Sequence, residues 1–306
     1  MKAFGYDHSG DPSVFQEYDI DTPEISDNQV LIKTVAIGLN NYDRSQRAGA
    51  MGPSNGRTIP GRDSTGTVEK IGSNVTGFKV GDRVAAQAGH SYAEYVAANE
   101  SSVAHIPDNV SFNEAVGIIT SGTTAYNIVH TFGNIKSEQT IIVQGASGGV
   151  GSIVTQLAVD LGAKVIGIAS SKNEQLVKSY GVAKFVAYDK ENPAETLKNT
   201  ADVVVNGALN GAGGESDAEM VKPGGTIATV GFAEPETNKQ ITFNHVHRLG
   251  TVHASESLGQ LLDLMGKGKL SIKIGYKEPF TLNGFIKGHK ILDEKHSGRV
   301  IVTKES

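Results

Sequence analysis

The sequence of 306 residues contains no cysteine and no tryptophan. The absence of cysteine excludes disulfide bonds, cysteine nucleophiles and thiolate ligands for a metal. The sequence also lacks the run of about 18 uninterrupted apolar residues that a membrane span needs. The formal net charge is −5 at pH 7 and no run of like charges stands out, so a basic face for a nucleic-acid backbone is missing. We expect a small molecule as the partner, and neither nucleic acid nor a membrane.

The start of the chain has no apolar stretch of the kind that forms a signal peptide. Lys2 introduces a charge before such a stretch could begin. We therefore expect a cytoplasmic protein.

The chain is long enough for about two domains, and two patterns of predicted secondary structure follow one another along it. The first hundred residues alternate short β-prone runs with turn signals, which predicts a β-rich domain. The expected strands are 29–37, 65–71, 82–86, 92–97 and 102–106.

From residue 113 onward, apolar strands alternate with helical segments. The expected strands are 140–144, 164–169, 184–188, 202–206 and 226–230, and Gly162 and Gly181 stand where helices should end. This alternation predicts an α/β fold with a doubly wound parallel sheet and a ligand crevice at the carboxyl ends of its strands.

The pattern changes once more after residue 266. We expect an extended segment over 269–280, a helix over 283–295 and a final strand over 298–303. The final strand is expected to return to the first domain, because the parallel sheet is already complete. The predicted domains are therefore residues 1–116 with 266–306, and residues 117–265.

The most informative segment is residues 141–162, which is a buried strand, a glycine-rich turn and a helix in succession. Gly148 lets the main chain approach the phosphates of a dinucleotide, and Gly151 lets the helix pack on the strand. The alternative is a tight turn without a ligand. The expected cofactor-binding residues of the turn are Ala146, which replaces the usual first glycine, Ser147, Gly148, Gly149, Val150 and Gly151.

The end of the second strand of the parallel sheet lacks the acid that binds the adenosine ribose in proteins that prefer NAD. Ser170, Ser171 and Lys172 stand there instead, and a cation with hydroxyls suits the 2′-phosphate of NADPH. The alternative for Ser171 is a capping box with Glu174 that only starts a helix, and the two roles can coexist.

Five segments, together with the glycine turn, resemble the medium-chain dehydrogenase/reductases, in particular the zinc-free, zeta-crystallin-like quinone oxidoreductases. They are residues 38–43 (GLNNYD), 60–68 (PGRDSTGTV), 75–84 (VTGFKVGDRV), 123–126 (TTAY) and 222–225 (KPGG). The resemblance runs nearly end to end. It implies a GroES-like β-rich catalytic domain closed by both termini, an inserted Rossmann domain, an active site in the cleft and a homodimer formed by Rossmann edge strands.

The zinc-dependent branch of this superfamily holds its catalytic metal with Cys, a His-Glu pair and a further ligand. The matching positions here are Asn40 and Arg62-Asp63, and a guanidinium has no lone pair to give. The segment that follows Arg83 and Val84 leaves no room for a structural zinc lobe. His245 and His247 could share a strand face, but without a third ligand we expect solvated or hydrogen-bonded side chains, and we expect no metal.

The resemblance implies further site residues. Thr124 and the pair Gly231 and Phe232 would line the nicotinamide end. Tyr188 would hold the 2′-phosphate, or it would be an aromatic residue at a strand edge.

Two residues are candidates for the chemistry itself. Asn40 would donate its amide to the substrate or the nicotinamide, or it would be a turn residue. Tyr42 would donate a proton, or it would pack at the domain seam. Ser45 stands where the quinone oxidoreductases usually have a tyrosine, which departs from their pocket. We expect Arg47 and Arg62 to be structural ion-pair partners, and His90 to be a turn residue.

The sequence thus predicts an NADPH-dependent, metal-free oxidoreductase that transfers hydride directly to a quinone or an α,β-unsaturated carbonyl compound. Such acceptors are already activated, whereas a simple ketone would need a stronger electrophile. Two alternatives stay open. One is an enoyl-thioester reductase, and the other is an NADPH-binding sensor or structural protein with negligible turnover.

Overall fold

The computed structural model describes residues 1–231, 233–246, 254–294 and 296–305. The chain divides into two compact units, one of residues 1–120 and 250–306 and the other of residues 121–249. The return to the first unit comes earlier than the expected residue 266, because helix α7 (Ala254–Gly266) packs on strand β8 (Val103–His105) of that unit. In the described part of the chain, no helix is long and apolar enough to span a membrane.

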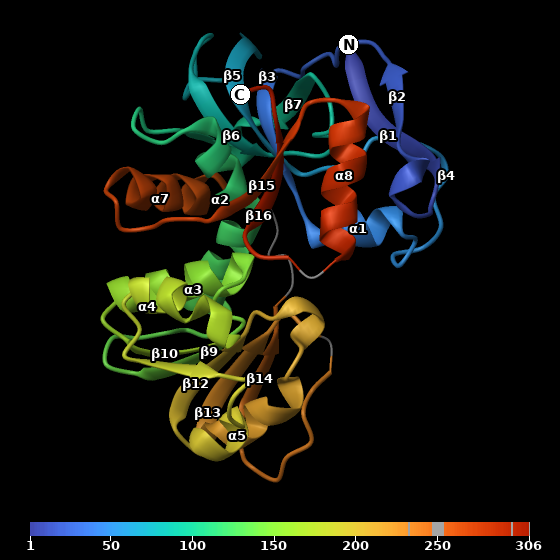
Figure 1. Cartoon of the computed structure of the whole chain (residues 1–306). Helices are drawn as coiled ribbons and strands as arrows, with labels where there is room; N and C mark the ends of the chain where they lie inside the picture. The colour runs from blue at the N-terminus through green and yellow to red at the C-terminus, as the bar shows by residue number, and fades with distance from the viewer. Residues whose placement is uncertain (232, 247–253, 295, 306) are drawn as a thin grey trace. The chain divides into compact units, whose positions relative to one another are not determined.

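The second unit is built on a parallel sheet with the strand order β11-β10-β9-β12-β13-β14 (Figure 1). Each neighbouring pair is parallel, which confirms the doubly wound α/β prediction. Its strands are β9 (Thr140–Gln144), β10 (Lys164–Ala169), β11 (Lys184–Ala187), β12 (Ala201–Asn206), β13 (Val221–Thr229) and β14 (Thr242–His245).

Helices or 3-10 turns lie in each connection from β9 to β13, the usual arrangement in a parallel sheet. They are α3 (Gly149–Asp160), α4 (Glu174–Ser179), α5 (Pro193–Thr196), α6 (Asp217–Met220), and short 3-10 turns at Ser171–Asn173, Leu209–Gly211 and Gly214–Ser216. Gly162 and Gly181 have φ values of +85°, so the glycines expected after α3 and α4 end these helices in the left-handed conformation. Helix α2 (Phe112–Asn127) and the π-helical turn Ile128–Phe132 precede β9.

The first unit contains the predicted β-rich sheet, in the order β15-β16-β3-β5-β6-β8 with β7 also paired to β3. Its strands are β3 (Gln29–Leu39), β5 (Asp63–Ile71), β6 (Arg83–Gln87), β7 (Tyr95–Asn99), β8, β15 (Ile274–Pro279) and β16 (Arg299–Thr303). The red C-terminal strand β16 lies antiparallel beside the blue β3 (Figure 1). The expected return of the last strand to the first domain is therefore confirmed.

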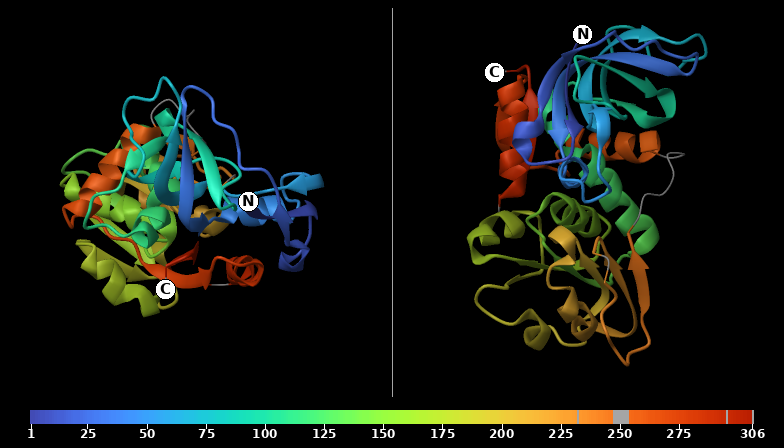
Figure 2. Two further views of the ribbon diagram at one scale, coloured as in Figure 1. Left: turned by 90° about the horizontal axis from the view of Figure 1, so that it is seen from above. Right: turned by 90° about the vertical axis from the view of Figure 1, so that its right-hand side faces the viewer.

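A second small sheet of the first unit, in the order β2-β1-β4, was not expected from the sequence. It consists of β1 (Lys2–His8), β2 (Gln16–Asp19) and β4 (Asn55–Thr58), with a 3-10 turn at Pro12–Val14 between β1 and β2. A further 3-10 turn, Glu100–Ser102, joins β7 to β8 of the larger sheet. An aromatic core with Phe4, Tyr92 and Phe285 joins β1 to helix α8 (Leu282–Asp293), and Figure 2 shows the red α8 next to the blue N-terminal segment.

Helix α1 (Asn41–Arg47) is fastened to α8 by a buried cation. The Arg47 guanidinium donates to both carboxylate oxygens of Asp293, at 2.8 and 3.0 Å, and the Arg47 side chain is 2% exposed. The expectation that Arg47 is a structural ion-pair partner is confirmed.

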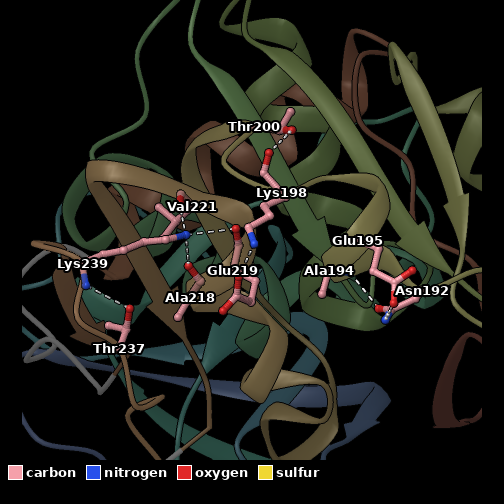
Figure 3. Close-up of polar contacts among 10 residues, drawn as sticks. All are labelled: Asn192, Ala194, Glu195, Lys198, Thr200, Ala218, Glu219, Val221, Thr237 and Lys239. Carbon is pink, nitrogen blue, oxygen red and sulfur yellow. Dashed lines mark hydrogen bonds and ion pairs between the residues drawn. The ribbon is translucent and has the colours of Figure 1, made fainter.

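Helix α6 is fixed by Lys239, which comes from the segment between β13 and β14. Its ammonium group donates to the carbonyl oxygens of Ala218, Glu219 and Val221, at 2.5, 3.0 and 3.0 Å (Figure 3). These carbonyls lie at the end of α6, where a helix leaves acceptors without partners of its own. The lysine therefore holds in place the short helix that begins with Asp217.

Candidate functional site

The turn between β9 and α3 is closed by backbone contacts at its glycines. Gly145 has a φ of +72°, and a Cβ at Gly151 would lie 2.2 Å from the carbonyl oxygen of Gly145. Because no side chain fits in that space, position 151 requires glycine. Gly207, which follows β12, lies against the same point, since its own Cβ would be 3.2 Å from the Gly151 nitrogen. The start of α3 therefore packs directly on the ends of β9 and β12.

The start of α3 has the geometry of an anion site. Gly148 is the N-cap, so the N–H groups of the next three residues, Gly149, Val150 and Gly151, have no acceptor within their own helix. A Cβ on Gly148 would meet only the Gly145 carbonyl oxygen, at 3.2 Å, so the space beyond it is open. These residues fit the pyrophosphate of a nicotinamide dinucleotide, as the glycine pattern predicts.

The other turn residues tie this loop to its surroundings. Ala146 is buried, and its N–H donates to the carbonyl of Ile168 in β10 at 3.0 Å. The Ser147 hydroxyl accepts a hydrogen bond from the amide of Asn173 at 3.1 Å. The loop that follows β10 is thereby joined to the glycine turn.

After β10, the two serines bind an aspartate. The N–H and the hydroxyl of Ser171 donate to the carboxylate of Asp189, each at 2.7 Å, and the Ser170 hydroxyl donates at 3.4 Å. The hydrogen bond from the Ser171 N–H, followed by that from its hydroxyl, lowers the pKa of Asp189. The alternative role of Ser171, a capping box with Glu174, is not formed, because the Ser171 hydroxyl donates to Asp189 and Glu174 pairs with Lys178 at 2.6 Å.

Lys172 and Tyr188 lie beside this pair of serines. Lys172 is exposed, and within the described residues no acid pairs with it. Tyr188 follows β11, is 48% exposed, and donates its N–H to the carbonyl of Ala169 at 3.2 Å. Both side chains are free to meet a ligand, and their predicted contact with a 2′-phosphate stays a prediction.

A buried polar group beneath the glycine turn was missed from the sequence. The amides of Gln144 and Asn206, the last residues of β9 and β12, donate to the carboxylate of Asp217 at 2.5 and 3.0 Å. Burial raises the pKa of Asp217 to about 6, against the opposing effect of these two hydrogen bonds. No spacing in the sequence links residues 144, 206 and 217, although the polar ends of two apolar strands were a visible signal.

The three residues expected at the nicotinamide end differ in their burial and contacts. Thr124 is half-buried in α2. Gly231 is buried, donates its N–H to the hydroxyl of Thr229 at 2.9 Å, and packs so closely on Gly211 that a Cβ would meet its Cα at 2.8 Å. Phe232 lies outside the described residues.

In the first unit, Asn40 stands at the centre of a buried polar group. Its amide donates to Oδ2 of Asp63 at 2.9 Å, and its Oδ1 accepts from Arg299 at 2.6 Å. Thr120 also donates to Asp63, through its hydroxyl at 2.5 Å and its N–H at 3.1 Å. Asn40 is 4% exposed, so its contacts in this structure are with the protein itself.

Asp43 is the second carboxyl of this group. Its Oδ2 accepts from the Asn40 N–H at 2.9 Å and from the Tyr92 hydroxyl at 3.3 Å, while its Oδ1 has no hydrogen-bond partner among the described residues. The Tyr92 hydroxyl also lies 3.0 Å from Nε2 of His289, a buried imidazole whose pKa is lowered by desolvation. Burial first, and then the charge of Asp63, raises the pKa of Asp43 to about 7.

Tyr42 lies at the surface of the first unit, with 37% of its side chain exposed. The guanidinium of Arg62 stacks on its ring, 3.9 Å from the centroid, so Arg62 forms a cation–π contact with this tyrosine where we expected an ion pair. His90 is a turn residue as expected, with a φ of +59° and its Nδ1 2.9 Å from the carbonyl of Ile59.

The donor set for a metal is poor in the described part of the chain, where no three His, Asp or Glu side chains are grouped as ligands. His245 lies in β14, and His247 lies outside the described residues. At the position that matches a zinc ligand, the Asp63 carboxylate is already used by Asn40 and Thr120.

Two family models match the chain. The alcohol dehydrogenase GroES-like domain matches residues 26–131, and the zinc-binding dehydrogenase model matches residues 149–267.

Individual proteins are similar over nearly the whole chain. A protein of Solanum lycopersicum named 2-methylene-furan-3-one reductase is 33% identical over 99% of this chain and 79% of its own length. The chloroplastic NADPH-dependent alkenal/one oxidoreductase of Arabidopsis thaliana is 32% identical with the same coverage. The structure of a quinone oxidoreductase from Coxiella burnetii superimposes with a TM-score of 0.85, at 26% identity and over 99% of each chain.

The glycine turn yields a prediction that separates folding from binding. Gly151→Ala should lower the free energy of unfolding by about 1–3 kcal/mol, because its Cβ would be forced against the carbonyl of Gly145. Gly148→Ala should cost less stability but should weaken dinucleotide binding, since its Cβ would point into the open space. Urea unfolding and titration with a dinucleotide measure the two effects.

Gly259→Ala is the matched control for these variants, since a Cβ there meets nothing within 4 Å on helix α7. It should raise the free energy of unfolding by up to about 1 kcal/mol. Equal losses of stability for the variants at 148 and 151 would contradict the geometry of the turn.

The buried Asp43 yields a prediction about pH. Since its pKa rises from 3.8 to about 7 on folding, its stabilising contribution is complete below about pH 4 and is lost as the pH rises through 7. Asp43→Asn mimics the protonated acid. Between pH 5 and 8, the variant should therefore gain about 2–4 kcal/mol in free energy of unfolding relative to the wild type.

Urea unfolding at several pH values measures this difference. The exposed Asp108→Asn controls for the removal of one carboxylate from the first unit. Parallel pH profiles for the Asp43 variant and the wild type would refute the prediction.

Proposed function

Because the chain belongs to the medium-chain dehydrogenase/reductase superfamily, with the quinone and alkenal/one oxidoreductases as relatives, we propose that it transfers a hydride from NADPH to a quinone or an α,β-unsaturated carbonyl compound. The observation that carries the proposal is the Gly145–Gly151 turn, where the first N–H groups of α3 have no acceptor within their helix and a Cβ on Gly148 would meet only the Gly145 carbonyl oxygen. Bound NADPH supplies the hydride. The named activities of the two plant relatives support both the cofactor and the class of acceptor.

The class of hydride acceptor follows from the hydrogen-bond donors that the side chains offer. Addition of a hydride to a conjugated carbonyl or a quinone leaves negative charge on an oxygen, which a hydrogen-bond donor stabilises. Tyr42 has an exposed phenol on the first unit, and we assign it the role of donor to that oxygen. Asn40 is buried between Asp63 and Arg299, so we assign it the positioning of the β3–α1 corner from which Tyr42 projects.

Hydride transfer in this proposal needs no zinc. The chain has no cysteine, Asn40 occupies a position that a zinc ligand takes in related enzymes, and Arg62 has no lone pair to offer. Asp63 already accepts three hydrogen bonds. These side chains support a reaction that depends on positioning and hydrogen bonding.

The proposal includes a cytoplasmic homodimer without nucleic-acid or membrane partners. Among the described residues, β11 and β14 are the two edge strands of the parallel sheet, and in the proposed dimer β14 pairs with its equivalent in a second copy. The resemblance to the quinone oxidoreductases and the formal charge of −5 support these assignments.

The proposal predicts that purified protein oxidises NADPH with 1,4-benzoquinone and with a small enone, at rates that a chelator leaves unchanged. Preferential turnover of a crotonyl thioester would favour the enoyl-thioester reductase. NADPH binding without acceleration of any of the three reactions would favour a sensor or structural protein. Loss of turnover on chelation, with recovery on adding zinc, would refute the metal-free reaction.

Tyr42→Phe tests the donor. The variant should lower kcat for the enone by about 100-fold, the lower range for loss of a positioned proton donor, and should leave the KM for NADPH unchanged. Tyr18→Phe is the control, since it removes a phenol of the same unit that donates to Asp7 at 2.9 Å. An unchanged kcat for Tyr42→Phe would exclude this role.

A further inference from the structure

We infer that Asp189 sets the preference between phosphorylated and unphosphorylated dinucleotides, by opposing the 2′-phosphate and accepting the plain ribose hydroxyls. The inference rests on the proposed function, because it concerns the nucleotide that the Gly145–Gly151 turn would hold. It adds an acidic residue to a place where the sequence shows only serines and a lysine.

Asp189 lies at the ligand edge of the sheet because β10 and β11 are parallel neighbours. Ala169 pairs with Ala187 at the carboxyl ends of the two strands, so the loops that follow them meet. The loop after β10 is in turn joined to the glycine turn by the hydrogen bond from Asn173 to Ser147. Asp189 therefore belongs to the same edge as the phosphate-binding N–H groups of α3.

The hydrogen bonds of Asp189 use the donors that a 2′-phosphate would need. Both donors of Ser171 point to its carboxylate at 2.7 Å, and the Ser170 hydroxyl adds a third bond at 3.4 Å. A phosphate group that approached these serines would have to replace the carboxylate as their acceptor. Lys172 would remain as the nearby cation of this loop.

The negative charge of Asp189 also opposes the binding of a 2′-phosphate. The hydrogen bonds from Ser171 lower its pKa, so the carboxylate is ionised at neutral pH. A 2′-phosphate carries close to two negative charges at that pH, and like charges at short range repel. An unphosphorylated ribose has O–H groups that a carboxylate accepts, which is how the usual acid of NAD-preferring proteins works.

The acid comes from the end of the third strand in chain order, β11, and not from the second, β10. A search for Asp or Glu at the end of the second strand misses it, and the serines there suggest a site for phosphate alone. The geometry instead combines a cation, Lys172, with an opposing carboxylate. We expect a protein that uses NADPH with a preference over NADH that Asp189 keeps small.

Asp189→Asn tests the inference, since it removes the charge and keeps an acceptor for Ser171. Calorimetric titrations with 2′,5′-ADP, 5′-AMP, NADPH and NADH measure binding without turnover. The variant should bind 2′,5′-ADP and NADPH about fivefold more tightly at low salt, an effect of the size expected for an exposed charge, and the gain should shrink at high salt. Its affinity for 5′-AMP and NADH should not increase.

Glu138→Gln is the matched control, because Glu138 is an exposed acid of the same unit. It precedes β9 and so lies at the amino ends of the parallel strands, away from Asp189. This variant should change none of the four affinities. An unchanged ratio of 2′,5′-ADP to 5′-AMP affinity in Asp189→Asn would overturn the inference alone. Weaker binding of all four ligands would also overturn it, because Asp189 would then only hold the loop. If the wild type binds none of them, the proposed function fails too.

Discussion

The contact between Gly151 and the carbonyl of Gly145 is the constraint on which the second unit depends. It places the first turn of α3 directly on the end of β9, and Gly207 brings the end of β12 to the same point. Nothing larger than hydrogen fits at position 151. Gly148 is the N-cap of α3, so the first N–H groups of the helix have no acceptor within it. The chemistry that we propose needs this arrangement first, because a dinucleotide must be held before any other side chain can act on its reaction.

The parts of the fold that the sequence predicts are those with local signals. The strands of the parallel sheet are short apolar runs rich in Val and Ile, and Gly162 and Gly181 mark the helix ends after them. The small sheet of β1, β2 and β4 escaped prediction, because its pattern is weak and β1 pairs with a strand almost fifty residues away. The point at which the chain returns to the first unit was predicted too late, at residue 266, since only its packing on β8 assigns α7 to that unit.

The polar groups of the two units were harder to predict, because their partners are far apart in the sequence. Asn40 meets Arg299, and Gln144 meets Asp217, through the topology alone. Burial then raises the pKa of Asp43 and of Asp217, an effect that no motif encodes. The same reason explains why Ser171 does not form the capping box. Its spacing from Glu174 indicates a capping box, but Asp189 arrives from the next strand and takes the hydroxyl.

The central claim is that hydride passes directly from NADPH to a conjugated acceptor. Stereospecifically deuterated [4-²H]NADPH, supplied with a small enone, tests it most directly through the mass and NMR spectrum of the product. The account predicts deuterium on the β-carbon of the reduced product, retained in water, from one of the two C4 positions of the cofactor. Reduced products without deuterium from both the 4R-labelled and the 4S-labelled cofactor, formed while NADPH is consumed, would contradict the account.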